Sequence, residues 1–374
     1  MKAYKYRLYP SKAQVTRMNG TLALCCELYN AALQERRDAY RLERKSIHYI
    51  AQANQLPEIK AARPELNEIH SQVLQDVLKR LNKAFDGFFR RLKTKHKAGF
   101  PRFRSRSRYD SFTYIQSGFA LKDGKLRLSK IGDVKIKLHR PIAGKVKTLT
   151  ITRSATGKWY ACFSVEMEAQ ALPKNSKSVG IDVGVTHFAT LSNGEQIANP
   201  RFFRTDEKAL ARAQRKLSVE KKGTAKRAAS RKAVARIHER VTHRRRNFAH
   251  QLSRALVSSF GVIAFEDLNI KGMVKNHHLA KSIGDASWSQ LVQFTSYKAE
   301  NAGGKVMLVD PRNTSQMCSG CGEIAIKDLS ERVHNCSCGV VLDRDYNAAL
   351  NILARGLASL EINTQRSLSL KAGE

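Results

Sequence analysis

Two apolar runs that end in acidic residues constrain the fold of this chain more than any other feature. They read VGIDVG at residues 179–184 and VIAFED at residues 262–267, and each predicts a buried β-strand. A carboxylate at the buried edge of a sheet is costly to ionise unless a cation or a partner lies beside it. Asp182 and Glu266 are therefore candidate metal ligands.

The segments around these two runs predict the order of the strands. His187–Leu191 reads as a second strand, and Asn193-Gly194 as a hairpin turn into a third. A basic helical stretch, Lys208–Arg254, comes before the second acidic run, and KVMLVD at 305–310 supplies one more strand. Three antiparallel strands, then helices, then two further strands are the order of a ribonuclease-H-like α/β fold.

A third acid could complete a metal site. The sequence DRDYNAALNIL at 343–353 places Asp345 at the start of an amphipathic helix, with Asp343 as a rival two residues earlier. Three carboxylates from two strands and a helix could hold two Mg²⁺ ions about 3.5–4 Å apart, the geometry of phosphodiester hydrolysis. Alternatively, Asp345 could be only a helix cap, and Asp267 or Asp343 only surface acids.

Four clustered cysteines predict a second metal site. They are Cys318, Cys321, Cys336 and Cys338, and each pair precedes a glycine that allows a tight turn. Four thiolates suit a closed, tetrahedral structural Zn²⁺ site, which leaves no position for a catalytic water. The second pair is C-x-C, tighter than the commoner C-x-x-C, so His334 is kept as a reserve ligand.

The charge points to a nucleic-acid partner. The chain of 374 residues has 67 Lys+Arg and 32 Asp+Glu, a formal net charge of +35. Twelve Lys/Arg against one acid lie between Lys79 and Arg108, and sixteen against two between Lys208 and Arg254. No apolar run approaches the roughly 18 residues of a membrane-spanning helix, and the N-terminus lacks the apolar core of a signal peptide. These features exclude secreted, membrane-embedded and fibrous classes and favour a reducing cytoplasm.

The N-terminal part predicts a small β-barrel with a helical insertion. Ala3–Tyr9 alternates as a strand, Ser11 and Gln14 form a capping box that opens a helix, and 69–92 carries a second apolar helical stripe. Short strands follow at Ser111–Ile115, Leu126–Leu128, Val134–Leu138, Val146–Arg153 and Trp159–Glu166. Such barrels commonly bind oligonucleotides, and the basic segment PRFRSRSR at 101–108 suits backbone contact and base stacking.

Taken together, these motifs resemble the TnpB (OrfB) family of insertion-sequence proteins, the relatives of type V CRISPR nucleases. The resemblance spans residues 1–354. It rests on MKAYKYRLYPSKAQ, GFPRFRSR, VGIDVGVTHFATLSNG, IAFEDLNIKGM, GDASW, VDPRNTSQMCSGCG and DRDYNAALNIL.

The resemblance implies a multi-domain α/β architecture. Its parts would be a wedge β-barrel (1–10 and 97–172), an inserted helical recognition lobe (11–96), a RuvC-like nuclease domain (176–312 and 340–356) and a zinc-ribbon insert (313–339). Because the segment after Arg355 is Ser-rich and has few large apolar residues, we expect the tail 357–374 to be disordered.

The resemblance also implies an activity. Family members bind a guide RNA from the transposon end and cut double-stranded DNA beside a short transposon-adjacent motif. Matched to the family motif, the catalytic acids and ligands of Mg²⁺ (or Mn²⁺) are Asp182, Glu266 and Asp345, a choice that favours Asp345 over Asp343. We expect nucleic-acid contacts from Arg102, Arg104, Arg106, Arg244, Arg245, Arg246 and Arg312.

Other classes of function stay open. One is a guide-dependent DNA-binding repressor that never cuts, which the complete set of acids disfavours. Another is a protein-only transposase that performs DNA recombination, and a distant third is a zinc-binding structural scaffold. We expect a cytoplasmic, nucleoid-associated protein with no membrane partner, and the sequence predicts no oligomeric state.

Overall fold

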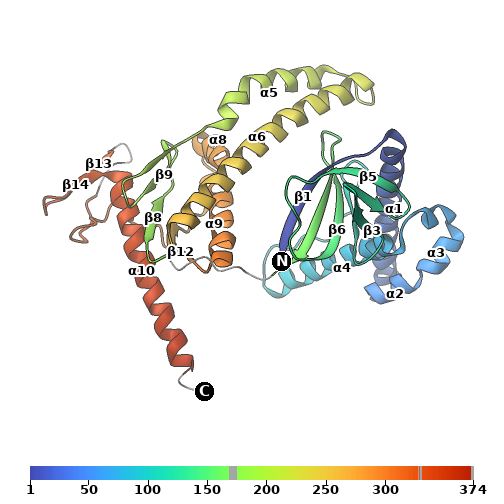
Figure 1. Ribbon diagram of the computed structural model, residues 1–374, viewed down its shortest axis with the longest axis horizontal. Helices are drawn as coiled ribbons and strands as arrows, with labels where there is room; N and C mark the ends of the chain where they lie inside the picture. The colour runs from blue at the N-terminus through green and yellow to red at the C-terminus, as the bar shows by residue number, and fades with distance from the viewer. Residues whose placement is uncertain (168–174, 327, 329–330, 372–374) are drawn as a thin grey trace. The chain divides into compact units, whose positions relative to one another are not determined.

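The chain divides into two compact units, Met1–Glu168 and Ala169–Glu374. The computed structural model in Figure 1 describes residues 1–167, 175–326, 328 and 331–371. Unit 1 holds the predicted barrel and its helical insertion, and unit 2 holds the acidic strands and the cysteines. Within the part of the chain that is described, no helix is both long enough and apolar enough to cross a membrane.

The sheet of unit 1 is a nearly closed antiparallel barrel. Its order is β2-β6-β7-β1-β5-β4-β3. The strands are β1 (Lys2–Tyr9), β2 (Ser111–Tyr114), β3 (Phe119–Lys122), β4 (Lys125–Leu128), β5 (Gly132–Lys137), β6 (Lys145–Arg153) and β7 (Trp159–Glu166). The two edge strands, β2 and β3, approach each other. The ring centroids of Tyr114 in β2 and Phe119 in β3 are 6.4 Å apart, and the Tyr114 hydroxyl donates a hydrogen bond to the Ser129 carbonyl. The barrel prediction is confirmed in these strands, and β3 was not predicted.

Helices fill the long connection between β1 and β2. They are α1 (Lys12–Glu43), α2 (Tyr49–Asn54), α3 (Leu56–Ala62), the 3₁₀-helix η1 (Pro64–Glu68) and α4 (Ser71–Lys93). Helix α1 begins where the sequence predicts, because Ser11 and Gln14 form both hydrogen bonds of a capping box.

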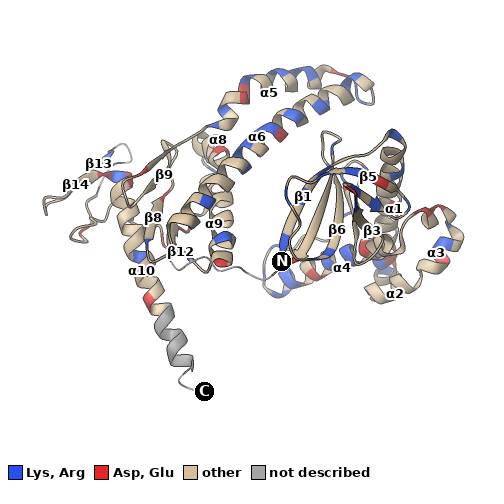
Figure 2. Ribbon diagram, in the orientation of Figure 1, with Lys and Arg blue, Asp and Glu red and all other residues tan. Residues whose placement is uncertain are grey.

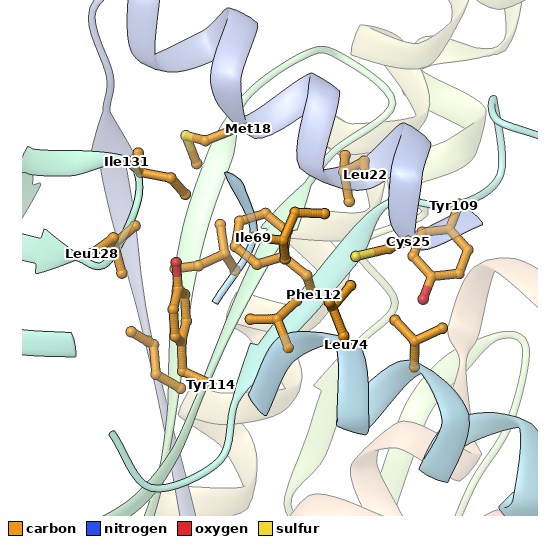
Figure 3. Close-up of a cluster of buried hydrophobic side chains, with 14 of the residues drawn as sticks. Met18, Leu22, Cys25, Ile69, Leu74, Tyr109, Phe112, Tyr114, Leu128 and Ile131 are labelled. Carbon is orange, nitrogen blue, oxygen red and sulfur yellow. The ribbon is translucent and has the colours of Figure 1, made fainter. Parts of the chain in front are cut away.

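The core of unit 1 lies where these helices pack against the barrel. Figure 3 shows Met18, Leu22 and Cys25 of α1 beside Leu74 of α4 and Phe112 of β2. Burial raises the pKa of the Cys25 thiol to about 12, which fits a packing role and not a reactive one.

The apolar stripe predicted on α4 leaves this core toward the end of the helix. Val73, Val77 and Leu81 are buried as predicted. Phe85 packs against the core but is only partly buried, as is Phe88, and Leu92 is 50% exposed, so the stripe predicted over 69–92 is fully buried only in its N-terminal part. The side-chain hydrogen bonds that α4 donates to β2 come from Arg80, in the first half of the helix.

The sheet of unit 2 has the order β10-β9-β8-β11-β12. Its strands are β8 (Ser178–Asp182), β9 (His187–Leu191), β10 (Gln196–Ala198), β11 (Val262–Glu266) and β12 (Lys305–Val309). Strands β8, β9 and β10 pair antiparallel, whereas β11 pairs parallel with both β8 and β12. The predicted succession of three antiparallel strands, helices and two further strands is confirmed.

Two long basic helices connect β10 to β11. Helix α5 (Phe202–Val219) and helix α6 (Ala225–Ser259) pack against each other, and Figure 2 shows Lys and Arg along both. The C-terminal half of α6 packs on α9 (Trp288–Ala302), where the His250 ring stacks on Phe294 at 4.0 Å. Two short helices, α7 (Ile270–Met273) and α8 (His277–Ala286), precede α9.

Helix α10 (Arg344–Lys371) crosses the sheet of unit 2 and contacts β8 closely. A side chain at Gly180 would place its Cβ 2.1 Å from the Ala349 carbonyl oxygen, so only glycine allows this approach. The disordered tail expected at 357–374 is wrong for residues 357–371, which continue α10. Residues 372–374 lie outside the described residues. A helix already nucleated by packing on the sheet extends at little cost, which explains the difference.

Candidate functional site

Two of the three predicted acids lie side by side at one edge of the unit 2 sheet. Asp182 is the last residue of β8, and Glu266 is the last residue of β11. These strands are parallel, and their register pairs Ile181 with Phe265, so the next residues on the two strands are Asp182 and Glu266. The carboxyl ends of parallel strands meet at the same sheet edge, which is why the two acidic runs converge.

The third acid reaches this edge from α10. Asp345 lies in the first turn of the helix, and its Oδ2 is 4.0 Å from the position that a Cβ on Gly184 would take. Asp343 has a different role, because it is exposed and accepts hydrogen bonds from the backbone N–H groups of Asp345 and Tyr346 at 3.0 Å. The cap of this helix is therefore Asp343, which leaves the Asp345 carboxylate available.

Burial raises the pKa of all three carboxyl groups. Burial raises the pKa of Asp182 well above its usual value, and the charges of Glu266 and Asp345 raise it further. Burial also raises the pKa of Glu266 and of Asp345. A cation stabilises the ionised form of acids whose pKa is raised by burial, so the donor set fits divalent metal ions.

The spread of these acids is wider than that of a single-ion cluster. Among the described residues, the one group of three or more acidic, Cys or His side chains whose ligand atoms all lie within 4.8 Å of one another is the set of four cysteines. The three carboxylates do not meet that distance. A wider spread is compatible with two ions about 3.5–4 Å apart, each held by a subset of the acids.

Sequence reasoning missed a residue that contacts this site. The buried Thr314 hydroxyl donates a hydrogen bond to Oε1 of Glu266, and this bond lowers the carboxyl pKa against the effect of burial. Thr314 lies in the loop after β12, so its approach depends on the fold. Arg355 of α10 adds a positive charge that also lowers the pKa of Glu266.

Two buried asparagines of α10 hold the same loop. Asn351 Nδ2 donates to the carbonyls of Thr314 and Met317 at 2.9 and 2.6 Å, and Asn347 Nδ2 also donates to Met317 at 2.8 Å. Asn347 Oδ1 in turn accepts from the Ser319 N–H. Two asparagines four residues apart on an otherwise apolar helix face were the sequence signal that could have revealed this contact.

The four predicted cysteines converge beyond this loop. The Cys318 and Cys338 sulfurs are 3.6 Å apart, and those of Cys321 and Cys336 are 3.5 Å apart. The sulfurs of a tetrahedral site with Zn–S bonds of about 2.3 Å lie about 3.8 Å apart, so the set fits zinc. The C-x-C spacing therefore still brings both pairs together.

Tight turns shape both cysteine pairs. Gly322 and Gly339 have φ angles of 82° and 91°, and their N–H groups donate to the carbonyls of Cys318 and Cys336. The backbone N–H of Cys338 lowers the pKa of the Cys336 thiol, whereas hydrogen bonds with Cys336 raise the pKa of Cys321 and of Cys338, so Cys336 is the first of these three thiols to ionise in the metal-free set. His334, the reserve ligand, is buried on β13 (Val333–Asn335), which pairs with β14 (Val341–Asp343), and is not part of the cluster.

The arginines predicted in unit 1 lie on an exposed loop. Arg102, Arg104 and Arg106 are all exposed. The loop backbone is anchored to α1, because Asn30 bonds both the N–H and the carbonyl of Arg104 at 2.8 Å. Arg106 forms an ion pair with Glu27, which partly neutralises the charge of its guanidinium.

The arginines predicted in unit 2 differ in their contacts. Arg245 is bound to the buried carboxylate of Asp285 at 2.8 Å, so its guanidinium joins α6 to α8, and its contact with nucleic acid stays a prediction. Arg244 lies 3.5 Å from Asp206 of α5. Arg246 and Arg312 are exposed, as a nucleic-acid contact requires. A helix that packs against neighbours needs some of its charges paired, and the sequence does not show which.

Three family models match parts of the chain. One described as "Probable transposase" (OrfB of IS605) matches residues 162–277, and one described as "Cas12f1-like, TNB domain" matches residues 288–352. A third, described as "Helix-turn-helix domain", matches residues 1–45. In the structure these residues form β1 and the single long helix α1, with no turn between two helices.

Two curated relatives match nearly the whole chain. A protein of Streptomyces pristinaespiralis named "Putative RNA-guided DNA endonuclease" is 36% identical over 96% of this chain and 90% of its own length. A protein of Escherichia coli (strain K12) with the same name and the suffix InsQ is 33% identical over 96% of this chain and 93% of its own length. The identity over almost full length shows common family membership.

A solved structure shares the fold. The Cas12f1 protein in a cryo-EM structure with sgRNA and target DNA matches with a TM-score of 0.58 and 16% sequence identity. The match covers 91% of this chain and 82% of that protein.

Proposed function

The chain belongs to the TnpB (OrfB) family, and from this membership we propose that it is an RNA-guided DNA endonuclease whose cutting site is the acid set Asp182, Glu266 and Asp345. The observation that carries the proposal is the convergence of Asp182 and Glu266 at the ends of adjacent parallel strands, with Asp345 delivered from α10. In this proposal unit 2 is a RuvC-like nuclease domain, residues 313–339 are its zinc-ribbon insert, and unit 1 supplies the wedge barrel and the recognition lobe.

The acids would hold Mg²⁺ or Mn²⁺. Asp182, Glu266 and Asp345 would together supply the carboxylate oxygens that hold the ions. When bound, such ions stabilise the charge that develops on the attacking and leaving oxygens of a phosphodiester. The raised pKa values of these acids support this assignment, because a cation offsets the cost of burial that raises all three and the repulsion that Asp182 receives from Glu266 and Asp345.

The remaining residues orient this set. Thr314 fixes one oxygen of Glu266, and the glycine at 180 lets α10 approach β8 closely enough to deliver Asp345. The four cysteines would bind a structural Zn²⁺ that holds the loop in which Thr314 lies. The exposed basic side chains of α5, α6 and the loop 101–108 would bind the guide RNA and the target DNA through phosphates, while base pairing reads the sequence.

The proposal includes where the protein acts. It would use an RNA from the transposon end, cut double-stranded DNA beside a short transposon-adjacent motif, and therefore work at the nucleoid.

A plasmid-cleavage assay tests the proposed function with the full chain, its co-purifying RNA and Mg²⁺. We expect a cut beside the guide-matched target that RNase pretreatment abolishes. Cleavage that survives RNase would favour a protein-only transposase, and binding without cleavage would favour a repressor.

A further inference from the structure

The helical part of unit 1 contains a cavity that the proposed cutting site does not use. Its volume is about 690 Å³, within the range of small-molecule sites. It lies between the C-terminal halves of α1 and α4, and Phe100 and the segment 46–48 complete its wall. All of its lining residues belong to unit 1.

One wall of the cavity is a cluster of four phenylalanines, Phe85, Phe88, Phe89 and Phe100, which we call the aromatic wall. The rings of Phe88 and Phe100 meet edge to face, with centroids 5.3 Å apart. Phe89 is 53% exposed and Phe100 is 45% exposed, although both carry large apolar side chains. Apolar rings gathered at an open cavity mark an interaction site.

A buried arginine lies behind this wall. Arg36 is only 7% exposed, and its guanidinium carbon is 5.2 Å from the Phe85 ring centroid. Its Nε donates to Gln52 at 2.8 Å and its Nη1 to Asn82 at 3.3 Å. Its Nη2 is buried and has no hydrogen-bond partner within the described ranges. A buried guanidinium with an N–H donor that has no acceptor costs free energy. The cavity therefore favours a ligand that brings hydrogen-bond acceptors or negative charge.

The charges around the cavity also favour an anion. Arg37 and Arg41 line it, and Arg37 also lies over the Phe103 ring at 5.2 Å. Of the two lining acids, Asp38 pairs with Arg41 at 3.2 Å, and Asp86 accepts from Asn82. The last turn of α4 adds further basic residues, Arg90, Arg91 and Lys93.

We propose that this cavity binds one unpaired nucleotide, with its base stacked on the exposed rings of the aromatic wall and its phosphate held by the surrounding arginines. Aromatic rings interleaved with arginines are the usual way to hold a single-stranded base without reading its sequence. A second copy of the chain is a poorer occupant, because it would bring two strongly basic surfaces together. The inference goes beyond cutting, since none of these residues belongs to the acid set.

The test is photo-crosslinking of the full chain, freed of nucleic acid, to short single strands that carry one 5-iodouracil. The strands are irradiated at raised salt, which weakens phosphate contacts at the cavity and elsewhere on this basic protein, whereas stacking persists. We expect the crosslinked peptide to contain the aromatic wall. Phe89→Leu, which keeps an apolar side chain without the ring, should reduce the yield about tenfold, the effect typical of losing one stacking ring.

Matched variants keep the test specific. Phe89→Tyr retains a ring and should crosslink as the wild type does, and Leu121→Ala removes an exposed apolar side chain of β3 outside the cavity and should change nothing. Parallel DNA and RNA strands show which nucleic acid supplies the nucleotide. An unchanged yield in Phe89→Leu, or crosslinks that map elsewhere, would overturn the inference. Plasmid cleavage by the wild type is scored separately, so a failure of the cavity and a failure of the nuclease remain distinguishable.

Discussion

The Thr314 hydroxyl donates a hydrogen bond to Oε1 of Glu266, although the two residues are 48 positions apart in the chain. Thr314 follows β12 and leads into the cysteine cluster, while Glu266 ends β11. The contact joins the loop that zinc would hold to one of the three proposed metal ligands. The orientation of Glu266 therefore depends on a loop that contributes none of the three acids.

Thr314→Val should therefore weaken metal use at the acid set. Valine keeps the shape but leaves Oε1 of Glu266 without its donor, a loss typically worth about 1–3 kcal/mol at a buried group. We expect the variant to need roughly tenfold more Mg²⁺ for half-maximal cleavage, and Thr314→Ser to restore the wild-type requirement. Mg²⁺ titrations of cleavage measure this. Equal Mg²⁺ requirements for Thr314→Val and the wild type would show that the hydrogen bond from Thr314 does not orient Glu266.

Gly180→Ala should move α10 away from β8. The added Cβ would lie 2.1 Å from the Ala349 carbonyl oxygen, so helix or strand must shift. Overpacking of this kind typically costs about 1–3 kcal/mol, and the shift should also lower cleavage by displacing Asp345. Gly284→Ala in α8, where nothing lies within 4 Å, should be neutral or slightly stabilising. Urea unfolding and cleavage rates check both variants, and equal stability of the two would contradict the packing argument.

Cys336→Ser should remove zinc from the protein. Elemental analysis should find about one zinc ion per wild-type chain and almost none in the variant, since a structural site needs all four ligands. Cleavage should fall at least about tenfold, because the loop that contains Thr314 loses its anchor. Cys162→Ser, which changes a half-buried cysteine of β7, is the control and should keep its zinc. Zinc retained in full by Cys336→Ser would mean that another residue takes its place.

Asp182→Asn should stabilise the metal-free protein at neutral pH. Burial and the neighbouring acids raise the pKa of Asp182 in the folded protein. Its favourable contribution to the free energy of unfolding is therefore present below the unfolded pKa of 3.8 and is lost as pH rises through the folded pKa. Removing the ionisation should raise the melting temperature by about 2–4 °C for each kcal/mol recovered.

Mg²⁺ should reverse this ranking, because it stabilises the ionised wild type alone. Calorimetry at pH 5 and pH 7, with and without Mg²⁺, measures the effect. Asp343→Asn, at the exposed cap of α10, should change little in either condition. A metal-free Asp182→Asn protein that melts below the wild type at pH 7 would contradict the assignment of a destabilised carboxylate.

The sequence predicted the acidic edge of unit 2 because local patterns determine it. Apolar runs ending in Asp182 and Glu266 become strands, and the crossover between them makes those strands parallel. The capping box at Ser11 and the four cysteines are likewise local patterns, and the structure confirms the capping box and the convergence of the cysteines.

What the sequence could not predict depends on contacts between distant segments. Thr314 is one of many threonines until the loop after β12 packs beside β11. Arg245 belongs to a run of three arginines, and only the position of α8 shows that it is bound to Asp285. The apolar stripe predicted over 69–92 begins with the buried Val73 and ends at Leu92, which is 50% exposed, because the sequence does not show how far other elements cover α4.

The most direct test of the account compares wild type and Asp182→Ala in one assay. Each full-length protein, loaded with a guide RNA, is incubated with Mg²⁺ and a plasmid that carries the matching target beside its motif. We expect the wild type to cut the plasmid, while Asp182→Ala binds the RNA equally well and cuts at least about 10³-fold more slowly, since the proposed metal site loses one of its three ligands. An Asp182→Ala protein that cuts at the wild-type rate would contradict this expectation.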